Sequence, residues 1–263
     1  MIIDAHVHLS RTSYGNAALY LAALREAGID AGMVVPGGMM DVRRMTDYVI
    51  GRADPENPAP DNDYIMECIT ADSSRFQGFV CLDPHGEDAA AELEGWFARG
   101  LVGLKLSPMT HRFSFACNAV AALAVCCGEH GLPLYAHTVY SPGASTARFL
   151  ALAKQFPGTH FILGHMGFGP ADREAVEAAA TLDNLFLETS TGNFLQLQEA
   201  LARAGHTKLI FGSEFPLSHP RVELEKILLL SLRGHELDKV LGGNIRALCG
   251  WPSMPAVEFG VKS

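Results

Sequence analysis

The chain has 263 residues, of which 48% are hydrophobic and 19% charged, and its formal net charge is −9. We expect one domain over residues 1–263, because a single α/β barrel commonly reaches this length. A surface of this charge repels nucleic acid phosphates and anionic lipids, so we expect a small-molecule partner and neither nucleic acid nor membrane.

Short apolar segments bounded by Gly, Pro or Asp alternate with segments of helical spacing. We predict strands at residues 2–9, 31–36, 76–82, 102–106, 132–137, 160–165, 185–189 and 208–212. Helical spacing is clearest at 17–28, 87–100, 119–131, 147–158 and 195–205. Strands joined by helices pair in parallel, so eight of them predict a (β/α)8 TIM barrel, with a doubly wound open sheet as the alternative.

One connection is much longer than the others. Residues 37–63 follow the second predicted strand and are rich in Pro and Asp in their second half. A loop of this length is usually functional or flexible. Because it leaves the carboxyl end of a barrel strand, where active sites are built, we expect a lid or a substrate-selecting loop.

The first predicted strand contains the sequence "DAHVH". Residues two apart on a strand point to the same side, so His6 and His8 are expected to project together, and Asp4 with them but deeper in the barrel. Asp4 is too deep for easy ligation, and we expect it to support the site by hydrogen bonds. These polar residues also interrupt any signal peptide, so we predict a cytoplasmic protein.

Three more polar side chains follow predicted strands. His137 ends the fifth strand, His165 ends the sixth, and Glu214 lies just past the eighth. Imidazole and carboxylate ligands suit a borderline divalent ion, with zinc as the first choice and manganese as the alternative. A bound zinc lowers the pKa of its water to roughly 7, and Glu214 is placed to accept the proton.

The sequence resembles the amidohydrolase superfamily, within it the amidohydrolase-related group that includes relatives of aminocarboxymuconate semialdehyde decarboxylase. The resemblance runs in order through "DAHVHL", "GLVGLKLSP", "YAHT", "FPGTHFILGHMG", "NLFLETS", "LIFGSEFP" and "VLGGNIRALCG". It covers essentially the whole chain and also implies a homodimer.

By position, the resemblance implies that His6, His8 and His137 bind the metal and that Glu214 takes the place of an acidic residue that binds metal or water. His165 matches a histidine that lies beside the metal as an acid, base or orienting group. The chain departs from the family in having Glu in "GSEFP", where Asp is usual. The extra methylene can turn a direct ligand into a water-mediated one, or the reverse, and is also compatible with a lost activity.

Several cations near the predicted strand ends are candidates for substrate binding. Lys105 ends the fourth strand; binuclear relatives carry a bridging lysine there, but this group generally does not, so we favour one metal and a substrate or supporting contact for Lys105. His111 and Arg112 follow that strand, and Arg43 and Arg44 lie in the long loop. Each arginine could hold a substrate carboxylate.

We therefore expect a metal-dependent hydrolase of a lactone, ester or amide, using an activated water. The alternative is a non-oxidative decarboxylase acting on an unsaturated or aromatic acid. Decarboxylating relatives often carry extra segments, and this short chain favours hydrolysis for that reason. A third hypothesis is a non-catalytic barrel. The six cysteines show no metal-binding or redox spacing and are expected to be buried thiols.

Overall fold

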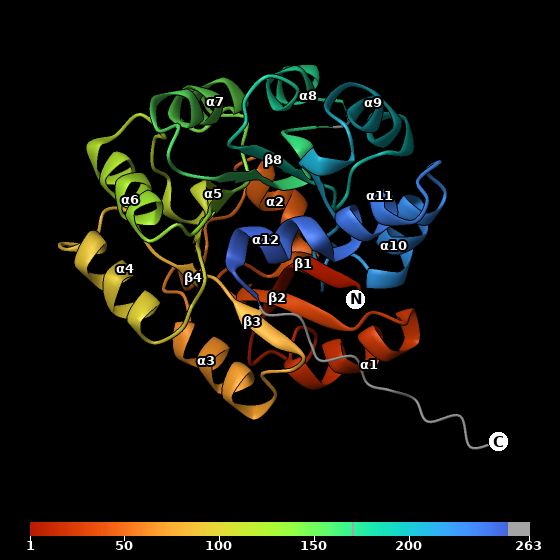
Figure 1. Ribbon diagram of the computed structural model, residues 1–263. Helices are drawn as coiled ribbons and strands as arrows, with labels where there is room; N and C mark the ends of the chain where they lie inside the picture. Colours follow the sequence, from red (N-terminus) through yellow and green to blue (C-terminus); the bar gives the residue numbers. More distant parts are fainter. Residues whose placement is uncertain (170, 252–263) are drawn as a thin grey trace.

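Nine short strands run in parallel in a computed structural model of the chain, which describes residues 1–169 and 171–251 (Figure 1). They are β1 Ile3–Leu9, β2 Ala31–Pro36, β3 Phe76–Gly78, β4 Val80–Cys81, β5 Leu104–Leu106, β6 Leu134–Ala136, β7 Phe161–Leu163, β8 Leu185–Glu188 and β9 Leu209–Ile210. Their hydrogen-bonded orders are β1-β2-β3 and β4 through β9.

Backbone hydrogen bonds join these two sheets into one barrel. β3 and β4 are halves of one predicted strand, and Phe79 between them donates its amide to Val34 O at 3.0 Å. At the other seam, Ala5 N donates to Phe211 O at 2.9 Å and Glu214 N donates to His6 O at 2.8 Å. The predicted eight-stranded barrel is confirmed, and the open-sheet alternative is wrong.

Helices surround the strands in Figure 1. The outer ones are α1 Ala17–Ala27, α3 Asn62–Ala71, α4 Ala89–Ala98, α6 Asn118–Glu129, α7 Thr146–Gln155, α8 Arg173–Ala179, α9 Phe194–Ala204 and α10 Pro220–Leu228. Asn16, Asp61 and Asp88 cap α1, α3 and α4 by accepting backbone amides, which fixes where these helices begin. Shorter pieces are α2 Met45–Val49, α5 Pro108–His111, α11 His235–Asp238, α12 Asn244–Cys249, η1 Val42–Arg44, η2 Gly164–Met166, η3 His206–Lys208 and η4 Lys239–Gly243.

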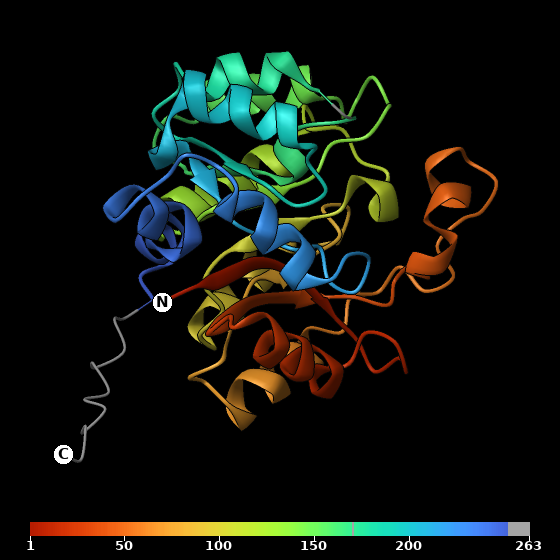
Figure 2. The same ribbon diagram turned by 90° about the vertical axis from the view of Figure 1, so that its right-hand side faces the viewer.

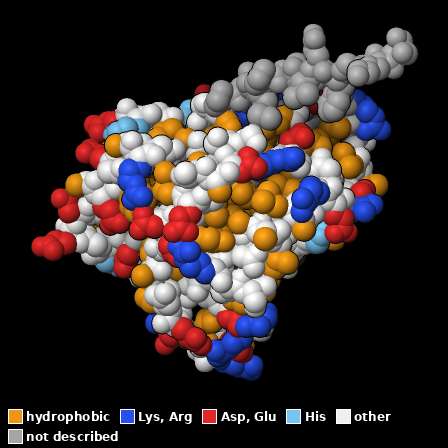
Figure 3. Space-filling model, turned by 90° about the horizontal axis from the view of Figure 1, so that it is seen from below, with side chains coloured by type: hydrophobic (Ala, Val, Ile, Leu, Met, Phe, Trp, Pro, Cys, Tyr) orange, Lys and Arg blue, Asp and Glu red, His pale blue; other side chains and the backbone are white. Residues whose placement is uncertain are grey.

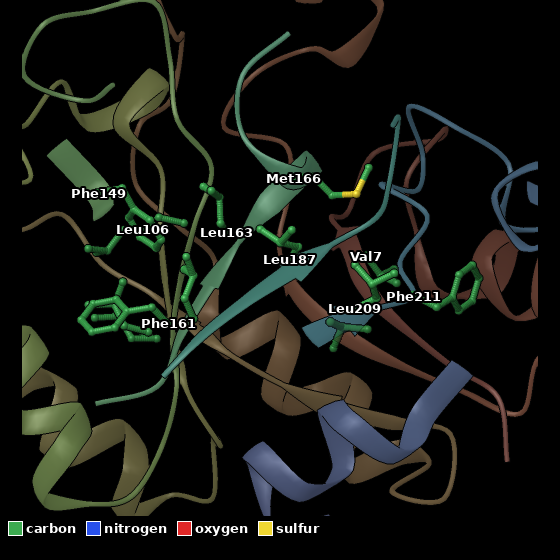
Figure 4. Close-up of a cluster of buried hydrophobic side chains, with 14 of the residues drawn as sticks. Val7, Leu106, Phe149, Phe161, Leu163, Met166, Leu187, Leu209 and Phe211 are labelled. Carbon is green, nitrogen blue, oxygen red and sulfur yellow. The ribbon is translucent and has the colours of Figure 1, made fainter. Parts of the chain in front are cut away.

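Apolar side chains fill two layers. Between the strands and the outer helices lie residues such as Val7, Phe149 and Phe161, shown in Figure 4. Inside the barrel, Ile3 and Ile210 pack with Ile245 of α12, which lies in front of the strands in Figure 1. The barrel interior at the amino end of the strands is thus filled by side chains. A pocket can therefore open only at the carboxyl end of the strands.

A register shift in β1 separates Asp4 from the two histidines. Ile3 and Ala5 belong to the interior layer, whereas Val7 belongs to the outer layer, and the pairing with β2 shifts between Asp4 and Val7. Asp4 consequently faces outward and accepts a hydrogen bond from the Tyr20 hydroxyl of α1 at 3.0 Å. The expectation that it shares the side of His6 and His8 is wrong, because a β-bulge reverses the alternation.

The long segment after β2 contains η1 and α2, and it projects from the barrel on the side away from the N-terminus (Figure 2). On the face seen in Figure 3, acidic and basic side chains are interspersed. No helix among residues 1–169 and 171–251 is long and apolar enough to span a membrane.

Candidate metal centre

Side chains from β1 and from the ends of three other strands meet inside the carboxyl end of the barrel. His6 Nε2 lies 3.1 Å from His8 Nε2. Glu214, which follows β9, places Oε2 2.8 Å from His6 Nδ1 and Oε1 3.5 Å from His8 Nε2. His165, in η2 after β7, places Nε2 3.9 Å from Glu214 Oε2. Four predicted site residues are thus within reach of one small ion.

Two buried atoms of this group lack a hydrogen-bond partner among the described residues. They are Nε2 of His137 and Oε2 of Glu214, which is close to His6 but not in hydrogen-bonding geometry. A buried polar atom without a partner is costly, and a cation is a partner that suits both a free imidazole nitrogen and a carboxylate oxygen. His6, His8 and Glu214 form a compact set of ligand atoms, so the donors fit a divalent metal ion.

The protonation of three of these side chains agrees with this fit. Burial lowers the pKa of His8 to about 4 and holds the pKa of His137 well below its ordinary value, so both rings are neutral at pH 7. Burial alone would raise the pKa of Glu214, but the neighbouring histidines hold it well below its usual range. Neutral imidazole and ionised carboxylate are the forms that bind metals.

Glu188, at the end of β8, is a member of the site that sequence reasoning missed. It is fully buried, and its Oε2 accepts a hydrogen bond from His6 Nδ1 at 2.9 Å and from the Tyr135 hydroxyl at 2.8 Å. The Ser190 hydroxyl donates to it at 2.9 Å and also lies 3.0 Å from His165 Nδ1. A carboxylate cannot donate, so Nδ1 of His6 carries the proton and Nε2 is left as the ligand atom.

Gly212 has no side chain and so leaves room for the carboxylate of Glu188. A Cβ atom at that position would overlap Glu188 and lie 2.9 Å from Cβ of His6. Only glycine fits there without moving one of them. The signal for Glu188 was present in the sequence, as a lone charge inside the predicted strand 185–189.

Lys105, in β5, lies behind the histidines. Its Nζ is buried, 3.0 Å from His6 Nε2 and 3.5 Å from the centre of the Tyr135 ring. Burial lowers its pKa to about 8. This position fits a supporting contact to the metal ligands better than the expected contact with substrate, since Lys105 is absent from the described residues that line the pocket.

The other expected substrate contacts are elsewhere. His111 uses Nε2 to bind the carbonyl oxygen of Pro58 at 2.9 Å, and Arg112 pairs with Asp54. Both therefore hold the long segment, and neither is among the residues found to line the pocket. Their contact with substrate stays a prediction, because in this structure residues of the long segment supply their partners.

A pocket of about 400 Å³ opens above the metal centre. Its deep end is lined by His8, His137, His165 and Glu214. Its mouth is lined by apolar side chains, several of them methionines of the long segment. His165 and Glu214 adopt left-handed backbone conformations, at φ 60° and 63°, which are costly for such residues and concentrate at functional sites.

Comparison with known proteins gives one match by sequence family. The profile of the family described as Amidohydrolase matches residues 3–251. No protein of curated function matches the chain.

Solved structures give many more matches. An uncharacterised TIM-barrel protein from Bordetella bronchiseptica has a TM-score of 0.76 at 16% identity, over 95% of this chain and 98% of its own. A dihydroxybenzoic acid decarboxylase from Polaromonas sp. JS666, with bound manganese and 2-nitroresorcinol, has a TM-score of 0.71 at 17% identity. This match covers 98% of the present chain and 99% of the decarboxylase.

A protein from Pseudomonas putida, provisionally named a 2-pyrone-4,6-dicarboxylic acid hydrolase, has a TM-score of 0.69 at 18% identity. This match covers 96% of the present chain and 98% of that protein. At these identities the likeness of all three structures shows the fold.

Proposed function

Because the chain belongs to the amidohydrolase family, we propose that it is a metal-dependent decarboxylase acting on an aromatic or unsaturated carboxylic acid. The observation that carries the proposal is a buried histidine and carboxylate cluster at the deep end of a pocket whose other lining side chains are mainly apolar. Such a pocket fits a planar apolar body whose one polar group reaches the metal. Decarboxylases of dihydroxybenzoate and of 5-carboxyvanillate share the fold and support this choice.

Chain length does not favour hydrolysis as expected. The match to the Polaromonas decarboxylase spans 98% of this chain and 99% of that chain. Chain length therefore does not distinguish decarboxylation from hydrolysis here. Hydrolysis of a lactone or amide remains the second candidate, because Glu214 beside a metal-bound water would also suit it. Family membership makes the chain an enzyme, which leaves the non-catalytic hypothesis without support.

The proposed roles follow from the contacts. His6, His8, His137 and Glu214 would hold one divalent ion, which supplies positive charge for a substrate oxygen. Glu188 fixes the tautomer of His6. Zinc and manganese both suit these ligands, and two of the decarboxylases that share the fold contain manganese.

Loss of carbon dioxide leaves a carbon that must gain a proton. His165 lines the pocket, and its Nδ1 lies 3.0 Å from the Ser190 hydroxyl, so we assign the proton transfer to its other nitrogen, Nε2, which would take a proton from solvent before the step and give it to the carbon that carbon dioxide leaves. The apolar walls exclude water from the carboxylate that breaks away, which weakens the solvation that stabilises it.

A deuterium experiment separates the two activities. The metal-loaded protein is incubated in D2O with a panel of aromatic and unsaturated acids and a panel of lactones and amides. Decarboxylation releases carbon dioxide and places one deuterium on the product carbon, whereas hydrolysis releases acid without carbon dioxide. Carbon dioxide release that persists unchanged in His165→Asn would contradict the role of that residue, and turnover of lactones alone would establish hydrolysis.

Two further predictions concern the whole protein. The cytoplasmic location agrees with six free cysteines, as expected in a reducing compartment. The predicted homodimer is testable by light scattering, which would give a mass twice that of the single chain.

A further inference from the structure

The pocket has one polar end and one apolar end. The apolar end is built mainly by the long segment after β2, with contributions from α5 and from two loops. Its apolar side chains are Met39, Met40, Val42, Met45, Val49, Met109, Phe168 and Leu217. Methionine side chains are flexible and polarisable, so they can cover apolar groups of different shapes. A ligand whose polar group sits at the metal centre would thus place its body against thioethers and a phenyl ring.

No Lys or Arg lies at this apolar end in the part of the chain that the structure describes. None of the described residues that line the pocket is Lys or Arg. Two arginines of the long segment already have partners: Arg43 is paired with Asp41 at 2.7 Å and Arg44 with Glu56 at 3.2 Å. A third, Arg52, is exposed and is not among the residues that line the pocket. Arg112 is paired with Asp54, and Lys105 is buried behind His6.

A second carboxylate on the ligand would therefore enter an apolar wall without a counter-ion. Desolvating a charge without a partner is strongly unfavourable, whereas an alkyl or aryl group at the same place gains from leaving water. The two ends of the pocket thus impose opposite requirements on the two ends of the ligand.

We propose that the site takes a carboxylic acid with a single negative charge and an apolar aromatic or alkenyl body, and rejects acids with a second, distant carboxylate. This inference rests on the proposed function, since it assumes that the first carboxylate lies at the metal centre. It distinguishes the chain from any relative acting on a dicarboxylate, as the name of the Pseudomonas putida protein implies for that protein.

The test measures binding rather than turnover. Manganese-loaded full-length protein is titrated calorimetrically with three matched probes: benzoate, 4-propylbenzoate and terephthalate. We expect 4-propylbenzoate to bind about tenfold tighter than benzoate, and terephthalate at least about tenfold weaker than 4-propylbenzoate. Terephthalate binding as tightly as 4-propylbenzoate overturns the proposal, as does the absence of binding by 4-propylbenzoate below about 10 mM.

A charge introduced at the apolar end sharpens this test. Met45 is half-buried and Val49 is 47% exposed, so both positions can carry an arginine without burying it fully. In Met45→Arg, and separately in Val49→Arg, terephthalate is expected to gain at least about tenfold relative to 4-propylbenzoate. Leu195→Arg, on the exposed face of α9, is the matched control and should leave the ratio unchanged. An unchanged ratio in both pocket variants overturns the proposal.

Failure here is distinguishable from failure of the proposed function. If the probes bind in the expected order but no acid of the panel releases carbon dioxide, the substrate class stands and decarboxylation is wrong. If dicarboxylates release carbon dioxide as fast as apolar monocarboxylates, decarboxylation stands and the substrate class is wrong.

Discussion

The metal centre and the long segment over the pocket mouth are held by different kinds of interaction. His6 within β1 and Glu188 at the end of β8 are fully buried and joined by a hydrogen bond. The long segment is instead tied down by pairs such as Arg112 with Asp54, whose side chains are 66% and 77% exposed. Exposed ion pairs are worth roughly 0–1 kcal/mol, whereas breaking a buried pair costs several. The barrel thus fixes the chemistry, and the loop can vary to set specificity.

The strongest test of this contrast removes a proposed ligand. His137→Ala deletes a buried nitrogen that lacks a partner, so we expect the metal content to fall below about 0.1 equivalents and activity to fall by at least about 100-fold. Metal analysis after dialysis checks this. His130→Ala, which removes an exposed histidine at the end of α6, should keep full metal content. Full occupancy in His137→Ala would remove His137 from the ligand set.

A smaller effect is expected behind the ligands. Glu188→Gln keeps the shape but replaces an acceptor by a group that also donates, so His6 is no longer held in one tautomer. Metal affinity should weaken about 10- to 100-fold, measured by competition with a chelator.

Glu223→Gln is the matched control for this change, because Glu223 is a buried carboxylate outside the cluster, paired with Lys226 at 2.6 Å. Its metal affinity should change by less than about twofold, because the partners of Glu223 are Thr191, Ser218 and Lys226, none of them a proposed ligand. Equal losses in both variants would mean that Glu188 acts through general stability.

The next effect concerns the Glu that replaces the usual Asp. Glu214→Asp withdraws a proposed metal ligand by one methylene, and we expect retained metal but a rate about tenfold lower, because the ion and the substrate oxygen on it would shift with the carboxylate. Steady-state rates and metal content are measured on the same sample. A faster enzyme would show that the longer side chain is a disadvantage for this reaction.

The smallest effect is expected at the mouth. Arg112→Ala removes one exposed pair, so the free energy of unfolding should change by less than about 1 kcal/mol, with metal content unchanged. Arg99→Ala, which breaks the exposed pair with Asp63, is the control in denaturant titrations. A loss of several kcal/mol specific to Arg112→Ala would mean that the long segment is an integral part of the barrel.

Sequence periodicity predicted the barrel and the positions where its chemistry gathers. The strand 31–36 and the helix at 17–28 lie where expected, within one residue. His6 and His8 lie in the first strand, and His137, His165 and Glu214 follow others, so their meeting at one end needed only parallel pairing around the barrel. Periodicity is a property of neighbouring residues in the sequence. It therefore predicted the strands, the helices and the site positions that local spacing decides.

Tertiary structure alone decided how these residues are supported. Glu188 is 182 residues from His6, and their contact depends on the closure of the barrel and on the small Gly212 between them. A bulge in β1 turned Asp4 outward to Tyr20, against the alternation of its strand. The sequence by itself determined which groups lie at the strand ends. Packing between distant segments decided which of these groups form hydrogen bonds with one another, because the partner of a buried charge is set by its neighbours in space.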